Sequence, residues 1–259
     1  MFEWISTLPV VWIALIVLAA MALLTVGIYA LVVRLAQGER ANAFQALSPG
    51  MLPPMGILFA LFVGFLAVGV WGNVDRADDA VADEASALRA VVILSGELPP
   101  DQRGRMRALV RSQIETAVND EWPAMEKRRA DLTAIPTALA QALHLAFGFH
   151  PQGEGQVMAQ RELVTAVRDA LAARRQRIVV SESSVNTVKW LGALALAALT
   201  LLAIALVHSE NRITARIAMG LFAVAVAAVI TMLAAQDQPF AGQLGIDPDV
   251  LEQVRPRAG

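Results

Sequence analysis

Two groups of charged side chains are the first places in this sequence where chemistry could occur. They are an acidic group, Asp75, Asp78, Asp79, Asp83 and Glu84, and a basic group, Arg174, Arg175 and Arg177. The acidic group could bind a cation, but it lacks the turn and the ligand spacing of a calcium loop. The arginines could attract anions or lipid headgroups. We expect both groups to be solvated helix faces that make ordinary ion pairs.

Other catalytic or metal-binding patterns are not evident. The histidines, His144, His150 and His208, show no ligand spacing, and no serine lies in a recognisable nucleophile motif. The chain has no cysteine, which excludes disulfides, thiol chemistry and Cys-ligated metal sites. We therefore predict that the protein is not an enzyme and that it holds neither a metal nor a cofactor.

The elements that carry the charged groups follow from hydropathy. Apolar residues make up 56% of the 259 positions and charged residues 17%, and the mean hydropathy of +0.54 is high for a soluble protein. Four charge-free windows are each long enough for the roughly 20 residues that a helix needs to cross a bilayer. These windows are residues 6–33, 41–74, 190–209 and 217–236. The net charge of −2 argues against a nucleic-acid surface, which should be clearly basic.

The second span is expected to continue beyond the membrane without a break. Residues 54–95 have the pattern of one long helix, which is apolar on all sides as far as Trp71 and amphipathic afterwards. Further helices are expected after Pro99 and from about Ile135, and Pro123 should kink or end the first of them. The prediction is an all-α integral membrane protein with four transmembrane helices and a helical soluble insert between the second and third spans. Its segments are a first transmembrane pair (1–71), the insert (72–187), a second transmembrane pair (188–236) and a C-terminal tail (237–259).

Two faces of the second span differ in side-chain size. One face carries small residues every four positions, Gly56, Ala60 and Gly64, which would let another helix approach closely in lipid. Another face carries Phe59, Phe62 and Leu66, which could line an apolar pore constriction that gates by dewetting. The alternative is that these three side chains face lipid or a neighbouring helix.

The spans contain no ionisable side chain except Tyr29. Ion-coupled carriers usually place carboxylates, histidine or basic residues at membrane depth, so this pattern argues against an energised transporter. A channel remains compatible with it, because pores can conduct through apolar necks. No Lys or Arg precedes the first span, so we expect an uncleaved anchor and not a secretory signal.

Several short motifs along the chain occur in a recognisable order. They are the apolar run 58–71 ending in Trp71, residues 83–88 with Glu84, Glu121-Trp122-Pro123, residues 174–178 with Arg174 and Arg177, Trp190, and Asp237 followed by Pro239, Phe240 and Gly242. In order and spacing these motifs resemble the bestrophin-like family of bacterial and plant membrane proteins. Two features depart from the family pattern. The basic connector between the first two spans is reduced to Arg34, Arg40 and Asn42, and Gln113 stands where a tyrosine is expected.

The resemblance implies a function as well as a fold. Bestrophins are pentameric anion channels with two spans, a helical soluble region and two more spans. Our first hypothesis is a homo-oligomeric ion channel, with anions as the expected ions, in a bacterial plasma membrane, with the second span near the pathway. Its partners would be the lipid bilayer, further copies of the chain and small inorganic ions. The alternative is a membrane-anchored scaffold or sensor whose insert binds a protein or lipid partner without transport.

The short connectors predict the orientation in the membrane. Basic residues in these connectors, Arg34, Arg40, Arg212 and Arg216, favour a cytoplasmic location for the connectors. The insert would then lie on the non-cytoplasmic side.

Overall fold

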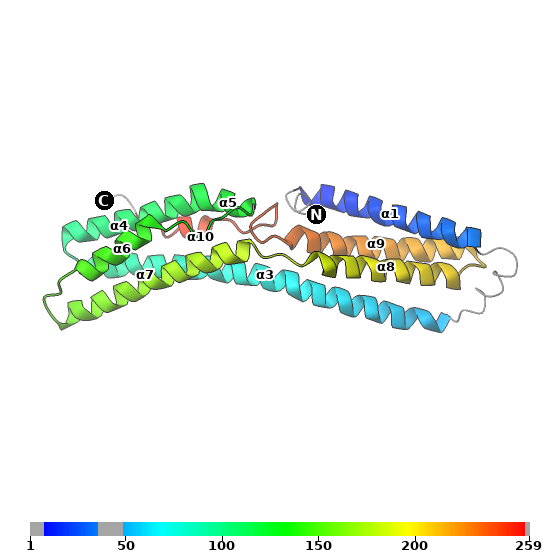
Figure 1. Ribbon diagram of the computed structural model, residues 1–259, viewed down its shortest axis with the longest axis horizontal. Coiled ribbons are helices and arrows are strands. Elements are labelled where there is room, and N and C mark those ends of the chain that lie inside the picture. Colours follow the sequence, from blue (N-terminus) through cyan, green and yellow to red (C-terminus); the bar gives the residue numbers. More distant parts are fainter. Residues whose placement is uncertain (1–7, 36–48, 257–259) are drawn as a thin grey trace. The chain divides into compact units, whose positions relative to one another are not determined.

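The computed structural model of the protein describes residues 8–35 and 49–256, and within these ranges every regular element is a helix (Figure 1). The expected all-α class is therefore confirmed. The elements are α1 (Val10–Leu35), η1 (Pro49–Met51), α3 (Leu52–Leu94), η2 (Ser95–Glu97), α4 (Pro100–Thr116), η3 (Ala117–Glu121), α5 (Trp122–Glu126), α6 (Thr137–Gly148), α7 (Glu154–Ser181), α8 (Thr187–Val207), α9 (Arg212–Gln236) and α10 (Asp249–Glu252). Of the connector residues used above, Arg40 and Asn42 lie outside the described ranges.

Four helices, α1, α3, α8 and α9, are long and apolar enough to cross a membrane, as the charge-free windows predicted. The predicted continuation of the second span is also confirmed, because α3 runs from Leu52 to Leu94 without a break at Trp71. Its 43 residues correspond to about 65 Å of helix, roughly twice the thickness of a bilayer core. A helix of this length must extend well beyond the membrane that it crosses.

The chain divides into two compact units. The membrane unit comprises Met1–Gly72, as far as it is described, together with Ser184–Asp237. The insert unit comprises Asn73–Ser183 together with Gln238–Gly259, again as far as it is described. The tail thus packs with the insert unit, although the helix that precedes it belongs to the membrane unit.

Small side chains hold the membrane unit together. Ala193 and Ala197 of α8 are fully buried, and Ala223 and Ala227 of α9 are nearly so. Residues four apart lie on one face of a helix, and small ones allow close approach of the backbones. The helices α1, α8 and α9 consequently pack closely on one another, whereas α3 makes fewer close backbone contacts.

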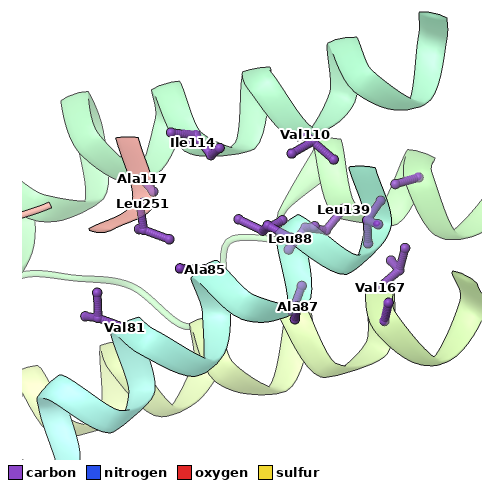
Figure 2. Close-up of a cluster of buried hydrophobic side chains, with 14 of the residues drawn as sticks. Val81, Ala85, Ala87, Leu88, Val110, Ile114, Ala117, Leu139, Val167 and Leu251 are labelled. Carbon is purple, nitrogen blue, oxygen red and sulfur yellow. The ribbon is translucent and has the colours of Figure 1, made fainter. Parts of the chain in front are cut away.

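The core of the insert unit forms where helices α3 to α7 and the tail meet, and Figure 2 shows part of it. Leu88 of α3, Val110 of α4, Leu139 of α6 and Val167 of α7 are fully buried there. The tail contributes Leu251 of α10 to the same core. Burying an aliphatic side chain of this size stabilises a fold by roughly 1.5–3 kcal/mol, so the tail is an integral part of the insert unit.

The helical path does not end at Pro123. It continues from α4 into α5 through a π-turn, η3, in which the Trp122 N–H donates to the Ala117 carbonyl. The buried positions therefore advance by five residues from Ala117 to Trp122, where a regular α-helix would advance by three or four. The irregularity expected at this proline is real, but it is a π-turn directly before Pro123 that presents Trp122 and Met125 to the core.

Candidate functional site

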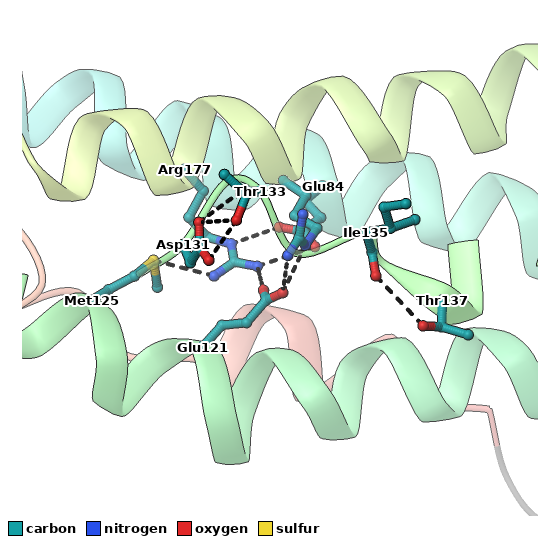
Figure 3. Close-up of polar contacts among 9 residues, drawn as sticks. Glu84, Glu121, Met125, Asp131, Thr133, Ile135, Thr137 and Arg177 are labelled. Atoms are coloured by element: carbon teal, nitrogen blue, oxygen red, sulfur yellow. Dashed lines mark hydrogen bonds and ion pairs between the residues drawn. The ribbon is translucent and has the colours of Figure 1, made fainter. Parts of the chain in front are cut away.

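Four charged side chains form a cluster inside the insert unit (Figure 3). They are Glu84 of α3, Glu121 at the end of η3, and Arg174 and Arg177 of α7. Arg177 donates from Nε to Oε2 of Glu84 and from Nη2 to Oε2 of Glu121, both at 2.6 Å. Arg174 donates from Nε to the other carboxylate oxygen of Glu121, also at 2.6 Å. Two arginines and two glutamates balance, so the formal charge of the cluster is zero.

Arg177 lies at the centre of this cluster. Its side chain and that of Glu84 are both 0% exposed. Burial lowers the pKa of Arg177, but the ion pairs with Glu84 and Glu121 outweigh burial, so the pKa is raised above its ordinary value. The guanidinium also lies 5.1 Å from the ring centroid of Trp122 and donates to Sδ of Met125 at 3.3 Å. Arg177 is therefore charged throughout the usual pH range.

The cluster joins three segments that are far apart in the sequence. A buried ion pair gives little net stability, because desolvation offsets the Coulomb attraction. Removal of one partner is costly, however, because it leaves an uncompensated buried charge. The arrangement therefore fixes how α3, η3 and α7 meet. None of the four groups is placed to act as a nucleophile with a neighbouring base.

Trp122 links this cluster to the tail. Its Nε1 donates to the carbonyl oxygen of Ile246 at 3.0 Å, and its ring meets Phe240 edge-on at 5.5 Å. The tail reaches Trp122 through a turn-rich loop, which is closed by a hydrogen bond from the Ile246 N–H to the Pro239 carbonyl. Gly242 has φ 78° in this turn, a conformation that favours glycine. The predicted motif residues Glu121, Trp122, Phe240 and Gly242 thus lie in one connected region.

The expectation of solvated charged faces is wrong for part of each group. Glu84, Arg174 and Arg177 are buried, although Arg175 is exposed. The four aspartates of the acidic group are exposed, as expected: Asp75, Asp78, Asp79 and Asp83. The periodicity of α7 explains which of its arginines are buried. Residues 174 and 177 are three apart and share a face of α7 with buried Val167, whereas residue 175 is turned away.

A cavity of about 370 Å³ lies beside the cluster. Its lining includes Gln113, Thr116, Glu121, Asp131 and Arg174. Gln113 is only 1% exposed, and its Nε2 has no hydrogen-bond partner among the described residues. Within the same residues no three His, Cys, Asp or Glu side chains are grouped so as to hold a metal ion. The lining is mostly apolar, and the unpartnered amide of Gln113 is a group in it that can donate to water or a small polar molecule.

The three residues predicted as pore-lining lie against other helices of the same chain. Phe59 packs edge-on against Phe222 of α9, with 5.4 Å between the ring centroids. The ring of Phe62 lies so close to Gly192 of α8 that a Cβ on this glycine would be 2.8 Å from it. Leu66 is 2% exposed in the core of the membrane unit. This arrangement matches the alternative in which the three side chains face a neighbouring helix.

The exposed face of α3 carries a different set of apolar side chains. Ile57, Leu61 and Phe65 are 66%, 54% and 69% exposed, and Val68 is exposed as well. We call these four residues the open face of α3. The first three are four positions apart, so they form a row along the helix.

The small residues of the second span also have no close neighbour on another described helix. A Cβ added to Gly56 or Gly64 would meet no atom of the described residues within 4 Å, and Ala60 is exposed. Their spacing predicts a close contact with another helix, and no described helix of the same chain makes it. It remains a prediction about contact with a second copy.

The remaining motif residues lie at the end of the membrane unit nearest in sequence to the insert. Trp71 donates from Nε1 to Oε1 of Gln236 at 2.8 Å. Asp237 accepts a hydrogen bond from the Val185 N–H at 2.9 Å. Trp190 of α8 is buried in the core of the membrane unit. The two hydrogen bonds hold the residues that flank the insert, Trp71 and Val185, within the membrane unit.

Comparison with known proteins identifies the family. The sequence model of the Bestrophin-like domain matches residues 19–251, which is most of the chain. The chain belongs to the bestrophin-like family. No curated protein sequence matches it significantly.

Solved structures show the bestrophin-like fold. A bacterial bestrophin homologue from Klebsiella pneumoniae, in a form with one substitution, superposes with a TM-score of 0.70 at 13% identity, over 92% of this chain and 96% of that one. A second structure of the Klebsiella pneumoniae homologue gives 0.66 at 13% identity, over 92% and 95% of the two chains. A structure described only as a membrane protein gives 0.68 at 11% identity, over 93% and 96%. At these identities the likeness concerns the fold.

Sequence reasoning missed two features of this bestrophin-like protein. One is the open face of α3, because an all-apolar helix gives no signal that distinguishes its faces. The other is the burial of Glu84 and Arg177, for which a signal did exist. Glu84 lies between Val81 and Leu88 on the apolar stripe of α3, and Arg177 adjoins Ile178 on the apolar stripe of α7. A charge within an apolar stripe indicates a buried pair.

Proposed function

We propose that this bestrophin-like protein is a subunit of a homo-oligomeric ion channel in a bacterial plasma membrane. The observation that carries the proposal is the open face of α3, a row of bulky apolar side chains that the described part of the chain leaves exposed. The second span also makes fewer close backbone contacts with the other three spans than these make with one another. Copies arranged around an axis would turn this row toward a shared pathway.

The chemistry of the row suits a gate. Ile57, Leu61 and Phe65 are about 6 Å apart along the helix axis, because four residues of an α-helix rise by about that distance. In an oligomer each position would contribute one ring of apolar side chains. Narrow apolar rings expel water and thereby block ions until they widen. The pathway residues proposed here are therefore Ile57, Leu61, Phe65 and Val68, in place of the Phe59, Phe62 and Leu66 expected from the sequence.

The small residues support contact between copies. Gly56, Ala60 and Gly64 lie on the same span and leave open space around the backbone. A helix from a second copy could approach closely at these positions, which is how helices associate in lipid. The resemblance to bestrophins, which are anion channels, makes chloride the first ion to test.

Ion flux through liposomes containing the purified protein tests the proposal. The wild-type protein should pass chloride, and Phe65→Ala should raise the flux because it removes the largest side chain of the row. Phe59→Ala is the matched control, because Phe59 packs against Phe222 and faces away from the proposed pathway. It should leave the flux at the wild-type level. Absence of flux of any tested ion in all three proteins would contradict the channel, and a larger effect of Phe59→Ala would contradict the choice of face.

A second candidate function is a membrane-anchored sensor that binds a small polar molecule in the insert. The cavity beside Arg174 and the unpartnered Nε2 of the buried Gln113 favour it. An absence of flux, together with a rise in the unfolding midpoint when small polar metabolites are added, would favour this function over the channel.

A further inference from the structure

The exposed side of α7 carries two stripes of opposite charge. Arg161, Arg168 and Arg175 recur every seven residues and are all exposed. Glu162 and Asp169 recur with the same spacing and are exposed as well. Because adjacent positions on a helix are about 100° apart, the basic and acidic stripes run side by side along α7 without facing each other.

These charges have no partners in the part of the chain that the structure describes. Among the described residues, none of the five side chains forms an ion pair or a hydrogen bond. The sequence also places no opposite charge three or four positions away from any of them. An ordinary solvated helix gains stability from such pairs. The α7 surface lacks them and keeps its two charged stripes unpaired.

The acidic stripe borders a groove between α3 and α7 of about 650 Å³. Glu162 and Asp169 line it from α7, and Asp83 lines it from α3. Its lining also includes five small side chains, Ala87, Ala90, Ala166, Ala172 and Ala173. Among the described residues no Lys, Arg or His contributes to this lining. The groove is therefore open to solvent, and its lining is made of small and negatively charged side chains.

We propose that the basic stripe of α7 from one copy docks into the acidic groove of the next copy. The spacing favours this occupant, because the arginines and the carboxylates both repeat every seven residues, which is about 10.5 Å along a helix. Two arginines can therefore meet two carboxylates at once. The small side chains leave room for the guanidinium groups to approach.

Such a contact is heterologous, because each copy offers two different surfaces. Head-to-tail contacts of this kind close into rings when the rotation between copies allows it. The inference rests on the homo-oligomer of the proposed function and specifies where the copies meet outside the membrane. It does not depend on which ion the assembly conducts.

Charge reversal and charge swapping test the interface. The first variant is Arg161→Glu/Arg168→Glu, the second is Glu162→Arg/Asp169→Arg, and the third combines all four substitutions. Each double variant places like charges opposite each other at the substituted positions, whereas the fourfold variant restores opposite charges there and the wild-type net charge. The full-length proteins are compared in mild detergent by light scattering and native mass spectrometry over a range of concentrations.

Each double variant should raise the protein concentration at which the oligomer dissociates by about tenfold or more, because like charges at an interface are strongly unfavourable. The fourfold variant should return it to near the wild-type value. Arg105→Glu/Arg107→Glu on α4 is the matched control, since both arginines are exposed and lie outside the two stripes. It should leave the oligomer unchanged. Circular dichroism checks that every variant remains folded.

The outcomes separate this interface from the channel. Oligomers that persist in both double variants, or a folded fourfold variant that fails to assemble, would overturn the interface even if the wild-type protein conducts. A wild-type protein that is a monomer would overturn both proposals. If the swap restores assembly but the wild-type oligomer conducts no ion, the interface stands and the channel does not.

Discussion

The buried cluster around Arg177 gives the sharpest prediction for stability. Arg177→Met keeps an unbranched side chain of similar length but removes the positive charge that faces Glu84 and Glu121. Glu84 is 0% exposed, and each of its hydrogen bonds in the cluster comes from Arg177. Breaking a buried pair in this way typically costs about 3–5 kcal/mol. For a chain of this size that corresponds to a fall of very roughly 6–20 °C in the unfolding midpoint of the insert unit.

A double substitution tests the reason for this loss. Glu84→Leu/Arg177→Met removes both charges and leaves Glu121 paired with Arg174. Replacing a buried pair with apolar side chains is often neutral, so the double variant should lie within about 1.5 kcal/mol of the wild type. Together with the single variant Glu84→Leu, it completes a double-mutant cycle that gives the coupling energy between the two positions.

Thermal unfolding of the full-length protein in mild detergent measures these effects, with circular dichroism as the probe. Arg105→Met is the matched control, because Arg105 is exposed on α4 of the same unit and lies outside the two charged stripes of α7. It should change stability by less than about 0.5 kcal/mol. A loss for Arg177→Met no greater than that of this control would refute the buried cluster. A double variant less stable than Arg177→Met alone would show that the pair is not the source of the loss.

Two further predictions concern the tail and the orientation in the membrane. Trp122→Phe should cost about 1–2 kcal/mol and expose the tail to limited proteolysis, because the hydrogen bond to Ile246 is lost; unchanged proteolysis would contradict this link. The chain has no native cysteine, so Gln152→Cys in the insert and Glu210→Cys in the connector between α8 and α9 are specific labelling sites. If the insert is non-cytoplasmic, a membrane-impermeant maleimide should label Gln152→Cys but not Glu210→Cys in intact spheroplasts, and the opposite pattern would reverse the orientation.

The sequence alone was sufficient to predict the four spans and the continuation of the second span as one helix. The four spans and the unbroken α3 follow from charge-free windows and from the change to an amphipathic pattern after Trp71. Transfer of a segment from water to lipid depends on that segment's own composition, so local sequence decides it. The motifs from Glu84 to Gly242 were sufficient for the family.

Tertiary structure decided which face of each helix is used and with what partner. Arg177 meets Glu84 and Glu121, which are 93 and 56 residues away in the sequence, and no local pattern specifies such a pairing. In the membrane unit, Phe59 and Phe65 are equally apolar, yet one packs against Phe222 and the other is exposed. Hydrophobicity fixes that a side chain avoids water, but it does not fix whether lipid, another helix or another copy covers it. Only the packing of distant segments makes that choice, because burial depends on the neighbours that the fold brings together.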